Sequence, residues 1–207
     1  MNEHILNILS RGERLALGPF IKAIGIPIPC YPDLRSIFSH PNSLRLLSIE
    51  MARLLEGERI DAIAGCVMGG VPLAIALSMM LNKPYLCIRP NARGSQGRPA
   101  IEGAYRKGQQ VVVVDDSLVT GRGKKRAVET LEKAGLKPTH IVVVMEIGGY
   151  PQWKNLRKWI EKKNLKVHSL VTWHEWAAYM QERGSISPEV AQTMLRLLET
   201  PPKWMKD

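Results

Sequence analysis

The sequence predicts an α/β fold built on a parallel β-sheet. Residues 111–114 are four consecutive valines, and residues 141–145 read IVVVM. Continuous apolar runs of this length are typical of strands that are buried on both faces of a sheet. A helical pattern lies between them at 123–134, and Gly135 ends it. Strand, helix and strand in this order predict a βαβ unit and therefore parallel pairing.

The other segments continue this alternation of strands and helices. Residues 1–40 are the exception, because they are rich in Pro and Gly and are expected to form a cap rather than a layer of the sheet. Further strands are expected at 60–67, 84–88 and 166–171, and further helices at 41–56, at 71–81, after residue 152, near 173–182 and at 188–199.

The charge balance indicates an anionic partner. The chain has 207 residues, with 29 Lys and Arg against 19 Asp and Glu, and a formal net charge of +10. Its content of 45% hydrophobic residues is enough for a buried core, so the charge does not indicate disorder. The excess instead favours nucleic acid, an acidic membrane surface or a phosphorylated small molecule as the partner.

Membrane and secretory classes are not favoured. The longest apolar run, at 71–81, is too short to span a bilayer, and the N-terminal residues carry too many charges for a secretory signal. The three cysteines are far apart and form no CxxC pair, so neither a disulfide framework nor a zinc site is expected. These features predict a cytoplasmic protein with no membrane contact.

A candidate anion site follows the valine strand. The strand runs into two adjacent carboxylates, Asp115 and Asp116, and a short loop then leads to a helix that begins near Gly123. Backbone N–H groups of such a loop, together with a helix N-terminus, suit a phosphate group. The carboxylates stand where they could bind ribose hydroxyls, directly or through Mg²⁺. The loop matches neither GxxxxGK[ST] nor GxGxxG.

The segment VVVVDDSLVTG resembles the motif by which type I phosphoribosyltransferases bind 5-phosphoribosyl 1-diphosphate (PRPP). The resemblance implies that Asp115 and Asp116 hold the ribose and that Thr120 contacts the 5′-phosphate. Gly123 stands where the family usually has Ser or Thr, which removes one hydroxyl contact. The segment GCVMGGVPL resembles the family's diphosphate loop. The further residues implied in PRPP binding are Met68, Gly69, Gly70, Ser117, Leu118, Val119, Gly121, Arg122, Gly123 and Lys124.

Within this family the chain is most similar to orotate phosphoribosyltransferases, through PCYPDLRSIFSHPNSL at 29–44 and KVHSLVTWHEW at 166–176. The resemblance implies a five-stranded parallel sheet flanked by helices, with a small N-terminal hood. It implies transfer of ribose 5-phosphate from PRPP to orotate, which gives orotidine 5′-monophosphate and diphosphate in pyrimidine biosynthesis. Mg²⁺ would be held largely by substrate oxygens, with Asp115 and Asp116 as possible protein ligands.

The resemblance also implies how the chain is organised. A single domain would cover 1–207, with the hood at 1–40, the PRPP-binding core at 41–150, and a C-terminal strand and helices at 151–207. A homodimer is expected, in which a lid loop at 89–103 of one subunit covers the active site of the other.

The lid and the base site depart from the family pattern. Arg89 keeps the leading basic residue of the lid, and Arg93 stands where a catalytic Lys is expected. Arginine can bind a departing diphosphate but cannot act as a general acid at neutral pH, so the lid is either a set of arginine clamps or a weakened loop. In the base site Met145 stands near the position of the family's orotate-binding Arg, with Glu146 beside it, and Lys22 is the candidate for a hood lysine.

These departures leave two alternatives to an orotate enzyme. One is a phosphoribosyltransferase for a different base, because an acid beside orotate would repel it. The other is a PRPP-sensing regulatory protein that binds nucleic acid. The positions of the Lys and Arg residues in the structure distinguish an enzyme from a regulatory protein. Basic residues gathered around one cleft favour the enzyme, and a broad basic stripe away from the cleft favours a protein that binds nucleic acid.

Overall fold

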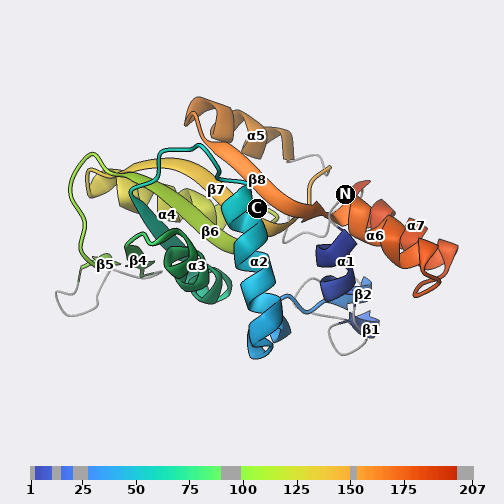
Figure 1. Ribbon diagram of the computed structural model, residues 1–207. Coiled ribbons are helices and arrows are strands. Elements are labelled where there is room, and N and C mark those ends of the chain that lie inside the picture. Colours follow the sequence, from blue (N-terminus) through green and yellow to red (C-terminus); the bar gives the residue numbers. More distant parts are fainter. Residues whose placement is uncertain (1–2, 11–14, 21–27, 90–98, 150–152, 200–207) are drawn as a thin grey trace.

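The computed structural model describes residues 3–10, 15–20, 28–89, 99–149 and 153–199 (Figure 1). Its main element is a six-stranded sheet in the order β5-β4-β3-β6-β7-β8. All neighbouring pairs are parallel except β4 and β5. The strands are β3 (Ala62–Cys66), β4 (Tyr85–Ile88), β5 (Ile101–Glu102), β6 (Gln110–Leu118), β7 (Lys137–Glu146) and β8 (Lys166–Thr172).

The five expected parallel strands are confirmed, and two details differ from the expectation. The short antiparallel strand β5 was not predicted, and it lies inside the expected lid segment 89–103. The strand β6 continues to Leu118, so Asp115 and Asp116 are strand residues rather than the start of a loop. Their backbones are fixed by pairing with β7, because Asp115 is opposite Val143 in the ladder.

Helices cover both faces of the sheet. Alternate side chains of β6 point to opposite faces, so Val112 and Val114 join one core cluster while Val111 and Val113 join the other. The first cluster contains side chains of α1 (Glu3–Leu9), α2 (Pro41–Arg53), α3 (Val67–Leu81), α6 (Trp173–Glu182) and α7 (Pro188–Glu199). The second contains side chains of α4 (Arg122–Lys133) and α5 (Trp153–Lys162).

The N-terminal region forms a separate small layer. The strands β1 (Leu15–Phe20) and β2 (Ile28–Pro32) pair antiparallel with each other and with no strand of the main sheet (Figure 1). A short 3-10 helix, η1 (Ser36–Ser39), then leads to α2. Within the described ranges, no helix has the length and apolar character that crossing a membrane requires.

Two histidines are stacked within the sheet. The rings of His140 on β7 and His168 on β8 have centroids 5.5 Å apart. Nε2 of His140 lies 3.4 Å from a carboxylate oxygen of Glu58, and Glu58 also pairs with Lys166. Burial lowers the pKa of both imidazoles, and the charges of Lys166 act in the same direction while Glu58 opposes the shift. The fold therefore favours two neutral imidazoles.

Replacing His168 with Leu should make the protein less sensitive to acid. A base whose pKa is lowered by folding contributes stability above its unfolded pKa, about 6.5 for histidine, and loses that contribution as the pH falls below this value. The drop in Tm between about pH 7.5 and about pH 5 should therefore be smaller in His168→Leu than in the unmodified chain. Thermal unfolding at a series of pH values measures this, and equal drops in the two proteins would show that the histidine stack does not contribute.

Candidate functional site

Two strand ends and two helix starts meet at one edge of the sheet. The parallel strands β3 and β6 lie side by side, with Gly65 opposite Val114. The helix α3 begins directly after β3, and α4 begins four residues after β6. Parallel sheets bind their ligands at this carboxyl edge, and helix N-termini there attract anions. The edge contains the residues of both sequence motifs.

Asp115 is buried and paired with a lysine. The residue is 7% exposed, and its carboxylate forms an ion pair with the ammonium group of Lys124, which is equally buried. Burial raises the pKa of Asp115 to about 6, Lys124 opposes this rise, and the neighbouring Asp116 adds to it. Lys124, expected to contact a phosphate, thus points its charge at the strand end and fastens the first turn of α4 to β6.

Asp116 faces a different cation. Its Oδ2 lies 3.3 Å from Nε of Arg35, and its Oδ1 accepts a hydrogen bond of 3.2 Å from the hydroxyl of Ser117. Arg35 lies in the turn before η1, where its backbone N–H donates to Oδ1 of Asp33 at 3.2 Å. In the sequence, Arg35 stands out only as part of the segment PCYPDLRSIFSHPNSL. Its one local signal is a basic side chain two residues after the acid that forms the turn.

Two glycines allow α3 to approach β6 closely. A Cβ on Gly69 would lie 2.2 Å from Oδ2 of Asp116, and a Cβ on Gly70 would lie 2.2 Å from the carbonyl oxygen of Val114. The first turn of α3 therefore lies against the carboxylate of Asp116, whose negative charge is stabilised by the helix N-terminus. Met68, the residue before these glycines, has a 75% exposed side chain.

The loop between β6 and α4 is held by one glycine and one hydroxyl. Gly121 has φ of 71°, a left-handed conformation that strains other residues, and a Cβ there would lie 2.4 Å from Cδ1 of Leu156 on α5. The backbone N–H of Arg122 donates to the hydroxyl of Thr120 at 3.5 Å. The expected phosphate loop is thus a tight turn whose N–H groups lie at the start of α4.

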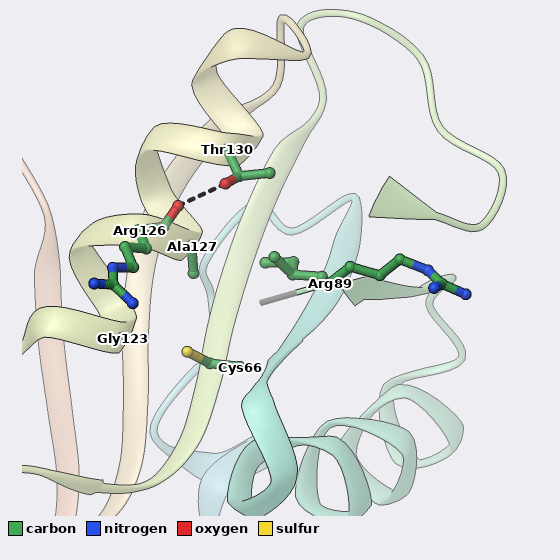
Figure 2. A pocket seen from close by; sticks show the side chains of 7 residues that line it. Cys66, Arg89, Gly123, Arg126, Ala127 and Thr130 are labelled. Atoms are coloured by element: carbon green, nitrogen blue, oxygen red, sulfur yellow. Dashed lines mark hydrogen bonds between the residues drawn. The ribbon is translucent and has the colours of Figure 1, made fainter. Parts of the chain in front are cut away.

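A small cavity lies between α4 and the ends of β3 and β4 (Figure 2). Its volume is about 70 Å³. Figure 2 shows the sulfur of Cys66 pointing towards α4 and the side chain of Arg89 extending away from it. Burial raises the pKa of Cys66 to about 12, so its sulfur is a neutral thiol and not a nucleophile at neutral pH. The cavity is lined by Cys66, Ile88, Arg89, Gly123, Arg126, Ala127 and Thr130.

The lid and base residues are only partly described. Arg89 donates from Nε to Oε1 of Glu102 at 2.7 Å, which joins the two ends of the lid segment. Glu146, at the end of β7, is half-buried, and burial raises its pKa while Arg157 opposes the shift. Met145 is fully buried in the core. Arg93 and Lys22 lie outside the described residues.

The residues at this edge of the sheet suit a metal ion that binds together with a phosphorylated substrate. They suit a metal ion held by protein side chains alone less well. Each of the two carboxylates already has a cationic partner. In the part of the chain that the structure describes, no three His, Cys, Asp or Glu side chains are grouped so that they could hold a metal ion. Hard cations such as Mg²⁺ commonly use one or two carboxylates together with substrate phosphates.

Comparisons with known proteins agree on one family. Residues 34–182 match the family described as "Phosphoribosyl transferase domain". The chain is 30% identical to the orotate phosphoribosyltransferase of Dinoroseobacter shibae, over 91% of this chain and 84% of that protein. It is 31% identical to the orotate phosphoribosyltransferase of Pyrococcus furiosus, over 84% of this chain and 94% of that protein.

The solved structures give the same result. The UMP synthase of Leishmania donovani superposes with a TM-score of 0.80 at 29% identity, over 94% of this chain and 41% of that one. The fold is that of the type I phosphoribosyltransferases, and the chain belongs to the phosphoribosyltransferase family.

The two close-packed glycines should differ in their tolerance of a side chain. Gly70→Ala places a methyl group against a backbone carbonyl of β6, which cannot move freely, and should lower the free energy of unfolding by about 1–3 kcal/mol. Gly69→Ala meets only the end of the Asp116 side chain and should cost less. Denaturant unfolding of both variants measures the difference.

Gly123→Ala is the matched control. A Cβ there would lie 3.5 Å from Sγ of Cys66, an ordinary contact, and alanine favours a helix over glycine by up to about 1 kcal/mol. This variant should be as stable as the unmodified chain or more so. If Gly70→Ala were as stable as Gly123→Ala, the close approach of α3 to β6 would be refuted.

Proposed function

We propose that the protein is an orotate phosphoribosyltransferase. It transfers ribose 5-phosphate from PRPP to orotate and releases diphosphate, a step of pyrimidine nucleotide synthesis. The observation that supports this best is the carboxylate pair Asp115 and Asp116 at the end of a buried strand, between the N-termini of α3 and α4. PRPP carries a phosphate at one end of a ribose and a diphosphate at the other, so it matches two helix starts on either side of two acids.

The ribose hydroxyls would bind the two carboxylates. Asp116 is the more accessible acid, and its partner Arg35 has a 65% exposed side chain, so a ligand can displace or share this pair. Asp115 keeps its buried partner Lys124 on Oδ2. Its Oδ1, which accepts a hydrogen bond of 2.9 Å from the backbone N–H of Asp116, would accept a second one from the ribose. Both acids then orient C1 of the ribose towards the incoming base.

The two phosphate groups would occupy the two helix starts. The 5′-phosphate binds the loop at 117–124, where the N–H groups at the start of α4 and the hydroxyl of Thr120 serve as donors. The diphosphate binds at 68–70, in the first turn of α3. Lys124 attracts the 5′-phosphate through its positive charge and not through a direct contact, because its ammonium group is bound to Asp115.

Transfer breaks the bond between C1 and the diphosphate oxygen and forms a bond between C1 and a ring nitrogen of orotate, whose proton passes to solvent or to the departing diphosphate. Negative charge develops on the departing diphosphate, and cations that surround it lower the barrier. When bound with PRPP, Mg²⁺ supplies part of this positive charge. Arg89 and Arg93 of the lid would supply more, and Arg89 must then leave Glu102.

The base would lie at the end of β7. Lys22 and the pair Met145 and Glu146 are our candidates for this part of the site. The raised pKa of Glu146 eases its protonation beside an anionic base, so that its carboxyl could donate a hydrogen bond to orotate. The same half-buried acid favours, as the second candidate function, transfer to a base that presents an amino group.

A homodimer is supported by an uncharged helix. The 15 residues of α3 include no charged side chain, and its outer face exposes Met68, Ile75 and Met79. A helix that is apolar on all sides is normally covered on all sides. We propose that a second copy covers this face and that the lid at 89–103 reaches across to the other subunit. We place the protein in the cytoplasm, because Cys66 and Cys87 are free thiols.

A panel of bases tests the function. The protein is incubated with PRPP, Mg²⁺ and, in turn, orotate, uracil, adenine, hypoxanthine or no base, and diphosphate release is measured. We expect release with orotate, and a rate at least about tenfold lower in Asp116→Asn, because a charge-assisted contact to the ribose is lost. Glu129→Gln, an exposed change on α4, is the matched control and should retain the full rate.

The other outcomes separate the alternatives. Release with a different base and not with orotate would refute the proposed acceptor while keeping the reaction. Tight PRPP binding without release for any base would refute the enzyme and favour a regulatory protein.

A further inference from the structure

The two faces of the sheet carry opposite charge. On one face, α4 and α5 together contain nine Lys and Arg against three Glu. On the other face, the helices α1, α2, α3, α6 and α7 contain three Arg against six Glu. The helices of one side therefore carry an excess of positive charge, and those of the other side an excess of negative charge. We call the positive side, the exposed residues of 122–133 and 153–162, the α4–α5 face.

The cations of the α4–α5 face form rows. Lys154, Lys158 and Lys162 are exposed and follow each other at intervals of four residues, so they lie along one line of α5 with about 6 Å of rise per step. On α4 the exposed basic residues are Arg122, Arg126 and Lys133.

The two helices lie next to each other, so their rows form one surface. The ammonium group of Lys125 on α4 lies 5.5 Å from the ring centroid of Trp159 on α5. Lys163, just after α5, donates to Oε1 of Glu132 on α4 at 2.9 Å. These contacts join the two helices, so their exposed basic residues lie on one surface.

The proposed reaction does not account for the row on α5. The residues of α5 that reach the site are on other positions of the helix, since Leu156 packs under Gly121 and Arg157 acts on the pKa of Glu146. The row also extends along the whole helix, away from the edge that holds the two acids. A small phosphorylated substrate needs a concave site, whereas this row is on the outside of a helix.

We propose that the α4–α5 face binds a nucleic acid through its phosphate backbone. A row of exposed cations matches a chain of phosphates, and phosphate contacts of this kind are independent of base sequence. An acidic membrane is a poorer match, because a membrane-binding helix exposes large apolar side chains. The described large hydrophobic side chains that are exposed come from other segments, and none from α4 or α5.

The proposal is independent of the proposed enzyme activity. The helix α3 lies on the opposite side of the sheet from α4 and α5. The α4–α5 face therefore stays accessible in a dimer formed through the exposed face of α3. Binding of nucleic acid can therefore accompany catalysis or occur in a protein that has none.

The test is fluorescence anisotropy of the full chain with a labelled single-stranded oligonucleotide of about 20 nucleotides and with the matching duplex. We expect binding that weakens steeply between about 50 and 200 mM salt. The variant Lys154→Glu/Lys158→Glu/Lys162→Glu should bind at least about tenfold more weakly, and its salt dependence should be shallower by about three in the slope of log K against log salt. Circular dichroism and an unchanged thermal unfolding transition report that the variant is folded.

A second triple variant with the same change in charge is the control. Arg53→Glu/Arg59→Glu/Lys83→Glu alters exposed residues outside the α4–α5 face and should bind the oligonucleotide within about twofold of the unmodified chain, because at such salt distant charges are screened. Equal loss in both variants, loss in neither, or no binding by the unmodified chain at about 50 mM salt would each overturn the proposal. So would binding to phosphatidylserine vesicles in place of the oligonucleotide.

Discussion

The site depends on a buried ion pair between Asp115 and Lys124. A strand of four valines runs directly into two acids, and the first of them is almost fully buried. A buried carboxylate requires a partner that offsets the loss of hydration. Lys124 supplies it from the first turn of α4, which fixes the turn at Gly121 and places the N-terminus of the helix beside the strand end. With Asp115 held in this way, Asp116 is directed to the ligand edge, where Arg35 and the first turn of α3 meet it.

Close packing on the other side of β6 completes the arrangement. Gly69 and Gly70 let the start of α3 lie against the last residues of β6, so two helix N-termini are brought to one edge with the acids between them. Positive potential from both helix ends is thereby available at separate places, one for each phosphorylated end of PRPP. The acids prevent the edge from being uniformly positive, and they provide the acceptors that a ribose requires. The lysine row on α5 is a separate feature, because Lys154, Lys158 and Lys162 lie outside the loop at 117–124 and the first turn of α3.

The features that could be predicted from the sequence are those that produce a pattern among neighbouring residues. The five parallel strands were recognisable because buried strands are continuous apolar runs, and the acids were located because they follow such a run. The strand β5 has only two residues, too few for any pattern, and the extension of β6 was missed because acids and Ser117 look like a loop in sequence. The ion pairs could not be predicted in the same way. Arg35 and Asp116 are 81 residues apart, and a lysine in a basic loop looks like a ligand contact until the fold buries it.

The dependence of ligand binding on the Asp115–Lys124 pair is tested by titration calorimetry of PRPP with Mg²⁺ at neutral pH. Lys124→Met leaves the buried acid without its cation, whereas Lys158→Met removes an exposed lysine of α5 as the matched control. The double variant Asp115→Asn/Lys124→Met restores a neutral pair and serves if the single variant does not fold. We expect PRPP affinity to fall at least about tenfold in Lys124→Met and in the double variant, and to be unchanged in Lys158→Met. Undiminished PRPP affinity in a folded Lys124→Met protein would contradict the account.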